Sequence, residues 1–293
     1  CFACLRSALL ASRSVSCVLL IRRPPRSQRQ CCIRASVCIR DRNAEISDAI
    51  IQLIEQGALQ ATSCMTQSDL WETAAAKLKP FSDRVDIGLH LNLTHTFASG
   101  NLVFPLPMLI VRAWSASLNR ELITQCIEEQ WDLFVSVLGK QPDFIDGHQH
   151  IHQFPFIRDI LLQLLKEKKF TGWIRNLQQP INPPHYRFKT RMLSALGSNS
   201  LAKACQTYHF NQNGQFAGIY DFKLTNYGQL NQYWLANAKD HLLIMCHPAL
   251  AQSKDQDPIQ HARIQEYQYF SSDQFQLDCQ QYGIQLTRLG AMQ

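Results

Sequence analysis

The chain of 293 residues is 46% hydrophobic and 18% charged, which is typical of a folded globular protein and long enough for one large α/β domain. Its net charge of +6 comes from residues 1–42, where nine arginines face one acid, because residues 43–293 hold 20 basic and 22 acidic side chains. Because the basic excess is confined to residues 1–42, the charge of the remaining chain argues against nucleic-acid binding by the body of the protein. The longest apolar run near the N-terminus, CVLLI, is too short to span a membrane.

The cysteines divide in the same way as the charge. Six of the eleven lie within the first 38 residues, and the other five are isolated, with no Cys-x-x-Cys pair among them. This spacing argues against a zinc knuckle or a disulfide scaffold, and it predicts reduced thiols in a cytoplasmic protein.

Residues 1–42 show neither helical nor strand periodicity, and the composition changes sharply at Asn43. Our hypothesis is that this segment is not native coding sequence but a read-through or assembly artefact fused to a truncated gene. A disordered basic extension and a transit peptide are the alternatives. We therefore expect a single domain over residues 43–293.

From residue 43 onward the chain alternates between helical and strand-like periodicity. Residues 43–57 predict an amphipathic helix that stops at Gly57, and residues 85–95 predict a strand with one apolar and one polar face. The same criteria predict helices at 123–139, 156–170 and 272–282 and strands at 142–146, 241–247 and 284–289. We expect residues 180–220 to form an irregular excursion over one face. Alternating strands and helices predict a parallel α/β fold, either open or closed into a barrel.

The segment DFIDGHQHIHQFP (143–155) carries polar side chains at every second position. In an extended backbone, Asp146, His148, His150 and His152 would all point the same way. Neutral imidazoles suit Zn, Ni, Co or Fe better than Mg, so the pattern predicts a metal site without deciding which histidines bind. The alternative is a partly solvated, histidine-rich loop.

Three further side chains are candidates for chemistry. His90 lies on the polar face of a buried strand, where it would line a cavity or pair internally. His247 directly follows an apolar strand, the position at which parallel barrels collect general acids and bases. Arg175 also lies at a predicted strand end, where it would hold an aspartate or a substrate oxygen or remain a solvated charge. Asp146 is placed to orient a ligand histidine.

Several segments, taken together and in this order, resemble the YdjC-like (ChbG/HpnK) carbohydrate deacetylases. The most specific are GLHLNLTH (88–95), DFIDGHQHIHQFP (143–155), WIRN (173–176) and MCHPA (245–249), supported by GALQATSCM (57–65) and ARIQEYQYFSS (262–272). The resemblance covers about residues 43–290.

The resemblance implies a TIM-like (β/α) barrel and a hydrolase that removes the N-acetyl group from amino sugars with a divalent metal, usually Mg²⁺. Zn²⁺ is the alternative that histidine ligation favours. By position, His90 and His148 match the family's metal ligands, and His247 matches the acid that protonates the leaving amine. Asp146, His150, His152 and Arg175 fall at substrate-binding positions or behind the ligands. A homodimer is the assembly that we consider.

One departure from the family pattern is serious. Family members begin with an Asp-Asp-Phe-Gly motif that supplies a metal ligand and the general base, but here Cys38 and Ile39 occupy those positions and Asp41 is displaced. We therefore expect a barrel that is incomplete at the first strand and a chain with impaired activity. Two alternatives remain: an inactive sugar- or metal-binding relative, or another metal-dependent, amidohydrolase-type barrel. The second class places its His-x-His on the first strand, which disfavours it.

Overall fold

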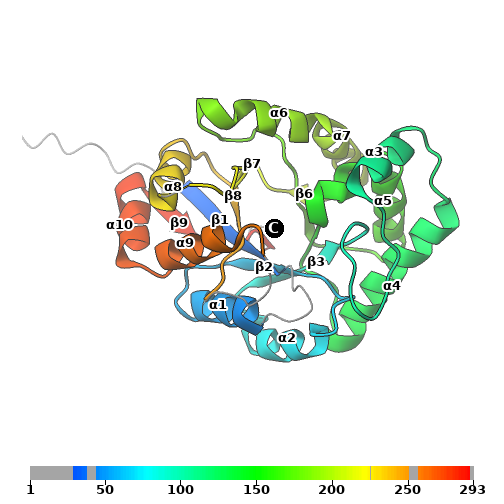
Figure 1. Ribbon diagram of the computed structural model, residues 1–293, viewed down its shortest axis with the longest axis horizontal. Helices are drawn as coiled ribbons and strands as arrows, with labels where there is room; N and C mark the ends of the chain where they lie inside the picture. The colour runs from blue at the N-terminus through cyan, green and yellow to red at the C-terminus, as the bar shows by residue number, and fades with distance from the viewer. Residues whose placement is uncertain (1–28, 38–43, 225, 251–256, 291–293) are drawn as a thin grey trace, which may run out of the picture.

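The computed structural model describes residues 29–37, 44–224, 226–250 and 257–290. Their strands form one sheet of parallel neighbours, with helices arranged around it (Figure 1). The strands are β1 Arg29–Val37, β2 Ala61–Cys64, β3 Asp86–Leu91, β4 Phe144–Gly147, β5 Trp173–Ile174, β6 Asn211–Gln212, β7 Gln215–Ala217, β8 Leu242–Cys246 and β9 Ile284–Leu286. The α-helices are α1 Ala44–Glu55, α2 Trp71–Leu78, α3 Leu106–Trp114, α4 Arg120–Leu138, α5 Ile157–Glu167, α6 Arg187–Ala195, α7 Ser198–Tyr208, α8 Tyr227–Ala236, α9 Gln260–Phe270 and α10 Asp273–Tyr282. Short 3₁₀ helices follow at η1 Lys79–Phe81, η2 His148–Gln153 and η3 Pro184–Tyr186.

The predicted parallel α/β fold is confirmed. The strands run in the order β6-β5-β4-β3-β2-β1-β8-β7, and β9 pairs with β1 beside this path. Within the described segments, no ladder joins the two outer strands β6 and β7, although Pro180 makes an isolated parallel bridge to Phe216 of β7. The sheet is therefore barrel-like without a continuous ladder around its circumference.

The expectation that the first strand is missing is wrong. Residues Arg29–Val37 form β1 at the centre of the sheet, where they pair with β2, β8 and β9. Cys31, Cys32 and Ile33 are fully buried there, so small and apolar side chains meet the requirement of a strand that is covered on both faces. The fold thus begins before residue 43. Cys38, Ile39 and Asp41 lie outside the described residues.

The strongly periodic elements lie where the sequence predicts them. The buried face of α1 consists of Ile46, Ala49, Ile50, Leu53 and Ile54, and Gly57 beyond it adopts a left-handed φ of 73°. Helix α4 begins after Asn119, whose side chain accepts the Leu122 N–H, and ends at Gly139 with φ of 72°. These caps satisfy backbone groups that the helix ends leave without partners.

Residues 180–220 are more ordered than expected. They contain η3, α6 and α7 in addition to the short strands β6 and β7. The proline at the start of η3, Pro184, occupies a position where a helix needs no N–H donor. The expectation of an irregular excursion is therefore wrong for the part of this region that forms η3, α6 and α7.

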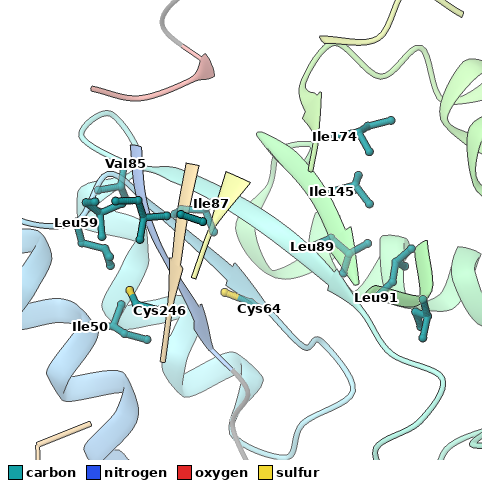
Figure 2. Packing of buried hydrophobic residues seen from close by; sticks show 14 of the residues in the cluster. Ile50, Leu59, Cys64, Val85, Ile87, Leu89, Leu91, Ile145, Ile174 and Cys246 are labelled. Atoms are coloured by element: carbon teal, nitrogen blue, oxygen red, sulfur yellow. The ribbon is translucent and has the colours of Figure 1, made fainter. Parts of the chain in front are cut away.

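The strands nearest the site are buried on both faces. Every residue of β3, β4 and β8 is buried, and their apolar side chains pack with those of α1 and α4. Figure 2 shows Leu89, Leu91, Ile145 and Ile174 lining one part of this packing. Polar side chains on such strands must pair inside the protein or line a cavity, which restricts where His90 and Asp146 can point. Among the helices of the described segments, none has the length and apolar composition needed to cross a membrane.

Candidate active site

A pocket of about 500 Å³ opens at the carboxyl ends of the strands. Its polar lining includes His90 near the end of β3, His148 and His150 after β4, Arg175 after β5 and His247 after β8. Parallel strands bring their carboxyl ends to one edge, so residues far apart in the sequence converge there. Apolar side chains complete the pocket: Leu106, Phe154, Leu193, Leu196, Ile219, Met245 and Ile259.

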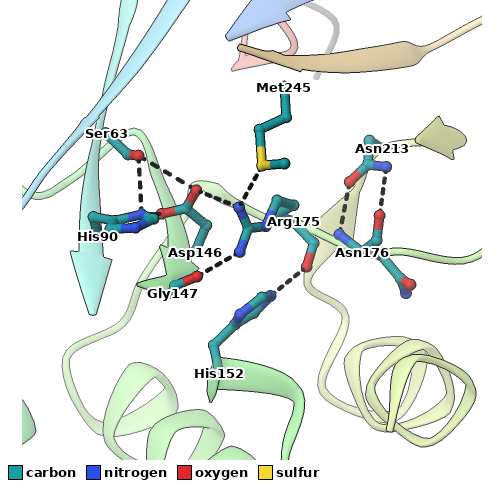
Figure 3. A network of polar contacts seen from close by, with 9 residues as sticks. All are labelled: Ser63, His90, Asp146, Gly147, His152, Arg175, Asn176, Asn213 and Met245. Atoms are coloured by element: carbon teal, nitrogen blue, oxygen red, sulfur yellow. Dashed lines mark hydrogen bonds and ion pairs between the residues drawn. The ribbon is translucent and has the colours of Figure 1, made fainter. Parts of the chain in front are cut away.

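A buried network connects β3, which carries His90, with β4, which carries Asp146 (Figure 3). His90 and Asp146 are register partners on β3 and β4, and His90 Nδ1 lies 2.6 Å from Asp146 Oδ1. Because an ionised carboxylate only accepts hydrogen bonds, Nδ1 carries the proton and donates it, which directs Nε2 away from Asp146. Ser63 also donates to the carboxylate, at 3.3 Å. Asp146 is thus placed to orient His90.

Arg175 supplies the positive charge of this network. Its Nη1 lies 3.0 Å from Asp146 Oδ2, its Nη2 donates to the Gly147 carbonyl at 2.6 Å, and the side chain is 1% exposed. Of the roles considered for Arg175, the geometry matches the one that holds an aspartate. A solvated charge is excluded by the burial.

The three histidines after β4 do not share one direction. Residues 148–153 form η2 rather than an extended segment, with left-handed φ values of 50° at Gln149 and 63° at His150. The expectation that all four polar side chains point the same way is therefore wrong. His148 and His150 line the pocket. His152 is fully buried and its Nε2 donates to the Arg175 carbonyl at 2.8 Å.

The surroundings of His152 keep it neutral. Burial, together with the nearby Arg175 guanidinium, lowers the pKa of His152 to about 3. The neutral imidazole stabilises the backbone at Arg175 through its hydrogen bond to the Arg175 carbonyl. Of the two roles that the resemblance implies for His152, a position behind the ligands fits better than substrate binding, because His152 is not among the residues that form the pocket.

His247 follows β8, which β2 and β1 separate from β3 in the sheet. Its backbone N–H donates to Glu266, and its carbonyl accepts from Arg263 Nη1 at 3.1 Å. The imidazole contacts the Phe222 ring edge-on, with 5.5 Å between ring centroids. The side chain is half-buried, so it can meet both a substrate and the solvent from which it is reprotonated.

Sequence reasoning missed several residues of the pocket. His95 lines it, with its ring centroid 6.0 Å from that of His148. The signal was Asn92, whose side chain accepts the His95 N–H and turns the chain back. Tyr220 and Phe222 were also missed, because they come from segments without periodicity or motif spacing that points to a cleft. Arg263 belongs to the motif ARIQEYQYFSS, but the motif alone did not place it in the pocket.

The two candidate metal ligands, His90 and His148, lie close to each other. His90 and His148 approach each other with ring centroids 5.7 Å apart. Within the described part of the chain, no group of three His, Cys, Asp or Glu residues is placed to hold an ion. Asp146, the nearest carboxylate in the network, is engaged by His90 and Arg175. Two imidazoles alone do not complete the ligand set that a hydrolytic metal requires.

Comparison with known proteins identifies the family. A family model described as YdjC-like protein matches residues 42–281. The chain belongs to the YdjC-like family. Two curated relatives carry the name chitooligosaccharide deacetylase. The one from Yersinia pestis is 27% identical over 213 residues, which are 68% of this chain and 74% of the relative. The one from Yersinia enterocolitica is 28% identical over 130 residues, 41% of this chain and only 49% of the relative.

A solved structure supports the fold. A protein from Enterococcus faecalis V583, described as a cellobiose-phosphate cleavage protein, aligns with a TM-score of 0.66 and 17% identity over 91% of this chain and 99% of its own. The matched family range contains all of the site residues predicted from the sequence, from His90 to His247, whereas β1 lies before it.

Proposed function

We propose that the chain is a carbohydrate deacetylase that hydrolyses the N-acetyl group of an amino sugar. One observation carries this proposal: His90, His148 and His247 line one pocket at the strand ends of a chain that belongs to the YdjC-like family. The names of the curated relatives indicate an N-acetylated chitooligosaccharide as the substrate class.

In the proposed reaction, a water molecule adds to the acetamide carbonyl, the C–N bond breaks, and acetate and a free amino sugar leave. The amine departs only if it receives a proton, and in this proposal the imidazole of His247, which is half-buried and lines the pocket, donates it. The apolar lining excludes water from the remainder of the cleft and offers contact to the faces of a sugar ring.

His90 and His148 are the residues that would hold a divalent ion, Mg²⁺ or Zn²⁺, in this proposal. Asp146 fixes the tautomer of His90 so that its Nε2 would be the ligand atom. Arg175 in turn holds Asp146 in place. The ligand set remains incomplete among the described residues, so we assign steps only to the side chains of the chain itself.

We further propose that the activity of this chain is low. The family's paired aspartates have Cys38 and Ile39 in their place, and neither side chain is an effective base for water at neutral pH. A chain that lacks this base would retain the sugar pocket and lose most of the rate.

The test is acetate release from N,N′-diacetylchitobiose by the full chain and by its C38D/I39D variant, each with Mg²⁺, with Zn²⁺ or with a chelator. We expect slow release by the original chain and a faster, chelator-sensitive release by the variant. Disaccharide binding without acetate release by either protein under all three conditions would instead identify an inactive sugar-binding relative.

A further inference from the structure

Helix α9 reaches the backbone of His247 with two charged side chains. Glu266 accepts the N–H of His247, and Arg263 Nη1 donates to the carbonyl of the same residue at 3.1 Å. The main chain of α9 adds a third contact, because the Arg263 carbonyl accepts the Ala249 N–H at 3.2 Å. Both peptide groups of the residue that bears the catalytic imidazole are therefore held from one helix.

The sheet does not hold the peptide groups of His247. The ladder between β1 and β8 ends at the pair Ala35–Cys246, and the ladder between β7 and β8 ends at Ala217–Ile244. His247 is the first residue beyond both ladders, where a backbone would otherwise depend on loop contacts. Hydrogen bonds with charged partners are about twice as strong as neutral ones, so Arg263 and Glu266 replace the missing strand effectively.

The two charged side chains are themselves fixed. Arg263 Nε lies 2.6 Å from Asp257 Oδ2, and the second oxygen of Glu266 accepts the Tyr220 hydroxyl at 2.5 Å. Glu266 is fully buried, and burial raises its pKa to about 7 although the bonds from Tyr220 and His247 lower it. Burial of a carboxyl group costs folding free energy, and the hydrogen bonds that both of its oxygens accept here offset part of that cost.

We propose that Arg263 and Glu266 are positioning residues, which fix the main chain of His247 and thereby direct its imidazole into the pocket. The catalytic consequence rests on the proposed function, whereas the structural one does not. Misplacement of a catalytic group by about 1 Å costs roughly 100-fold in rate, so loss of either contact should lower kcat far more than it changes KM.

The test compares Glu266→Ala with Glu266→Gln in the C38D/I39D background. The glutamine amide accepts the His247 N–H through its oxygen and donates to the Tyr220 oxygen through its nitrogen, so geometry survives without charge. We expect E266A to lower kcat about 100-fold with KM little changed, and E266Q to restore most of the rate. The matched control is Asp278→Asn, a fully buried carboxylate on α10 that accepts the Tyr269 hydroxyl at 2.7 Å and does not line the pocket.

A second measurement is independent of catalysis. In a chain labelled with ¹⁵N-histidine, the His247 amide proton, assigned with a His247→Asn variant, should resonate downfield because it bonds to a carboxyl group. It should move in E266A, stay near its position in E266Q and be unchanged in D278N. If E266A does not fold, Tyr220→Phe is the substitute, because it removes the hydrogen bond to one oxygen of Glu266. We expect a small shift of the His247 amide resonance in this variant.

The outcomes separate the two proposals. A folded E266A with the parent's kcat and an unmoved amide signal would overturn the positioning role, as would an E266Q variant as slow as E266A. If the C38D/I39D parent releases no acetate, the proposed function fails, and the amide signal alone still decides whether Glu266 holds His247.

Discussion

Asp146 and His90 face each other across neighbouring strands, with 2.6 Å between the carboxylate oxygen and Nδ1, and Arg175 closes the network from the other side of the carboxylate. All three side chains are almost completely buried. A buried pair of charges leaves the surviving partner uncompensated when one member is removed, so this network controls stability as well as the orientation of His90.

The first prediction follows from that burial. Asp146→Asn should lower the free energy of unfolding by about 3–5 kcal/mol, because Arg175 keeps its charge and loses its partner. Urea denaturation measures the change. The surface pair of Lys168 and Asp132, 3.2 Å apart and exposed, is the control, and Asp132→Asn should cost at most about 0.5 kcal/mol. Equal effects of the two substitutions would show that the buried pair contributes no more to the free energy of unfolding than the surface pair does.

A second prediction concerns the proposed acid. In the C38D/I39D background, His247→Asn should lower kcat by about 10²–10⁴-fold, with KM little changed, because the amide cannot deliver a proton to the leaving amine. The basic limb of the pH–rate profile should also disappear. Steady-state kinetics over a range of pH checks both points. A variant that retains this limb and most of its rate would assign the acid to another residue.

The third prediction concerns pH and His152. Its folded pKa of about 3 lies below the ordinary value of 6.5, so the unfolded chain takes up a proton that the folded chain refuses. The stability due to this group is full above pH 6.5 and decreases as the pH falls toward 3, by at most about 1.4 kcal/mol per pH unit.

The measurement compares the original chain with His152→Gln, which does not titrate but can donate to the Arg175 carbonyl. Glu266 contributes with the opposite sign, because its raised pKa makes its contribution fall as the pH rises from 4.5 toward 7. Both proteins contain Glu266, so its effect cancels in the difference. A difference in unfolding free energy that does not change between pH 4 and pH 6.5 would contradict the assignment.

Phe222 supports a fourth prediction. It holds an unfavourable φ of 62° for an aromatic residue, while its ring borders His247 on one side and lies 5.5 Å from the Lys189 ammonium. We expect this ring to contact the sugar, so that Phe222→Ala raises KM about tenfold in the C38D/I39D background. Phe188, 82% exposed on α6, is the control, and F188A should behave like the parent. An unchanged KM in F222A would remove Phe222 from the binding surface.

The sequence predicts those parts of the fold that carry a strong local signal. Helix α4 has an apolar stripe and a glycine stop, and β3 has clean alternation, so both appear where expected. Strand β1 has no such alternation. Its strand conformation comes from pairing with β2, β8 and β9, which are distant in sequence, and tertiary context overrides local pattern in strands.

The site is predictable to a similar degree. Strand ends and motif spacing brought His90, His148 and His247 together correctly as pocket residues. The left-handed backbone at Gln149 and His150 was not visible in the sequence, and it is this turn that removes His152 from the pocket. The contacts of Glu266 with His247 and Tyr220 join three segments that are far apart in the sequence. The motif ARIQEYQYFSS marks Glu266 as part of the family resemblance, but it does not reveal these partners.

In this protein, strand β1 contributes to the sheet without depending on a reactive side chain. A β-ladder is made by peptide groups, which every residue other than proline supplies in full, so many sequences can occupy the centre of the sheet if their side chains fit the space. Val37, at the end of β1, is paired with Cys64 of β2, and Ala35 with Cys246 beside His247. We therefore expect that residues following the strand can be substituted without loss of the pocket, provided that the packing of β1 is preserved. Acids and bases can accordingly be introduced at these positions.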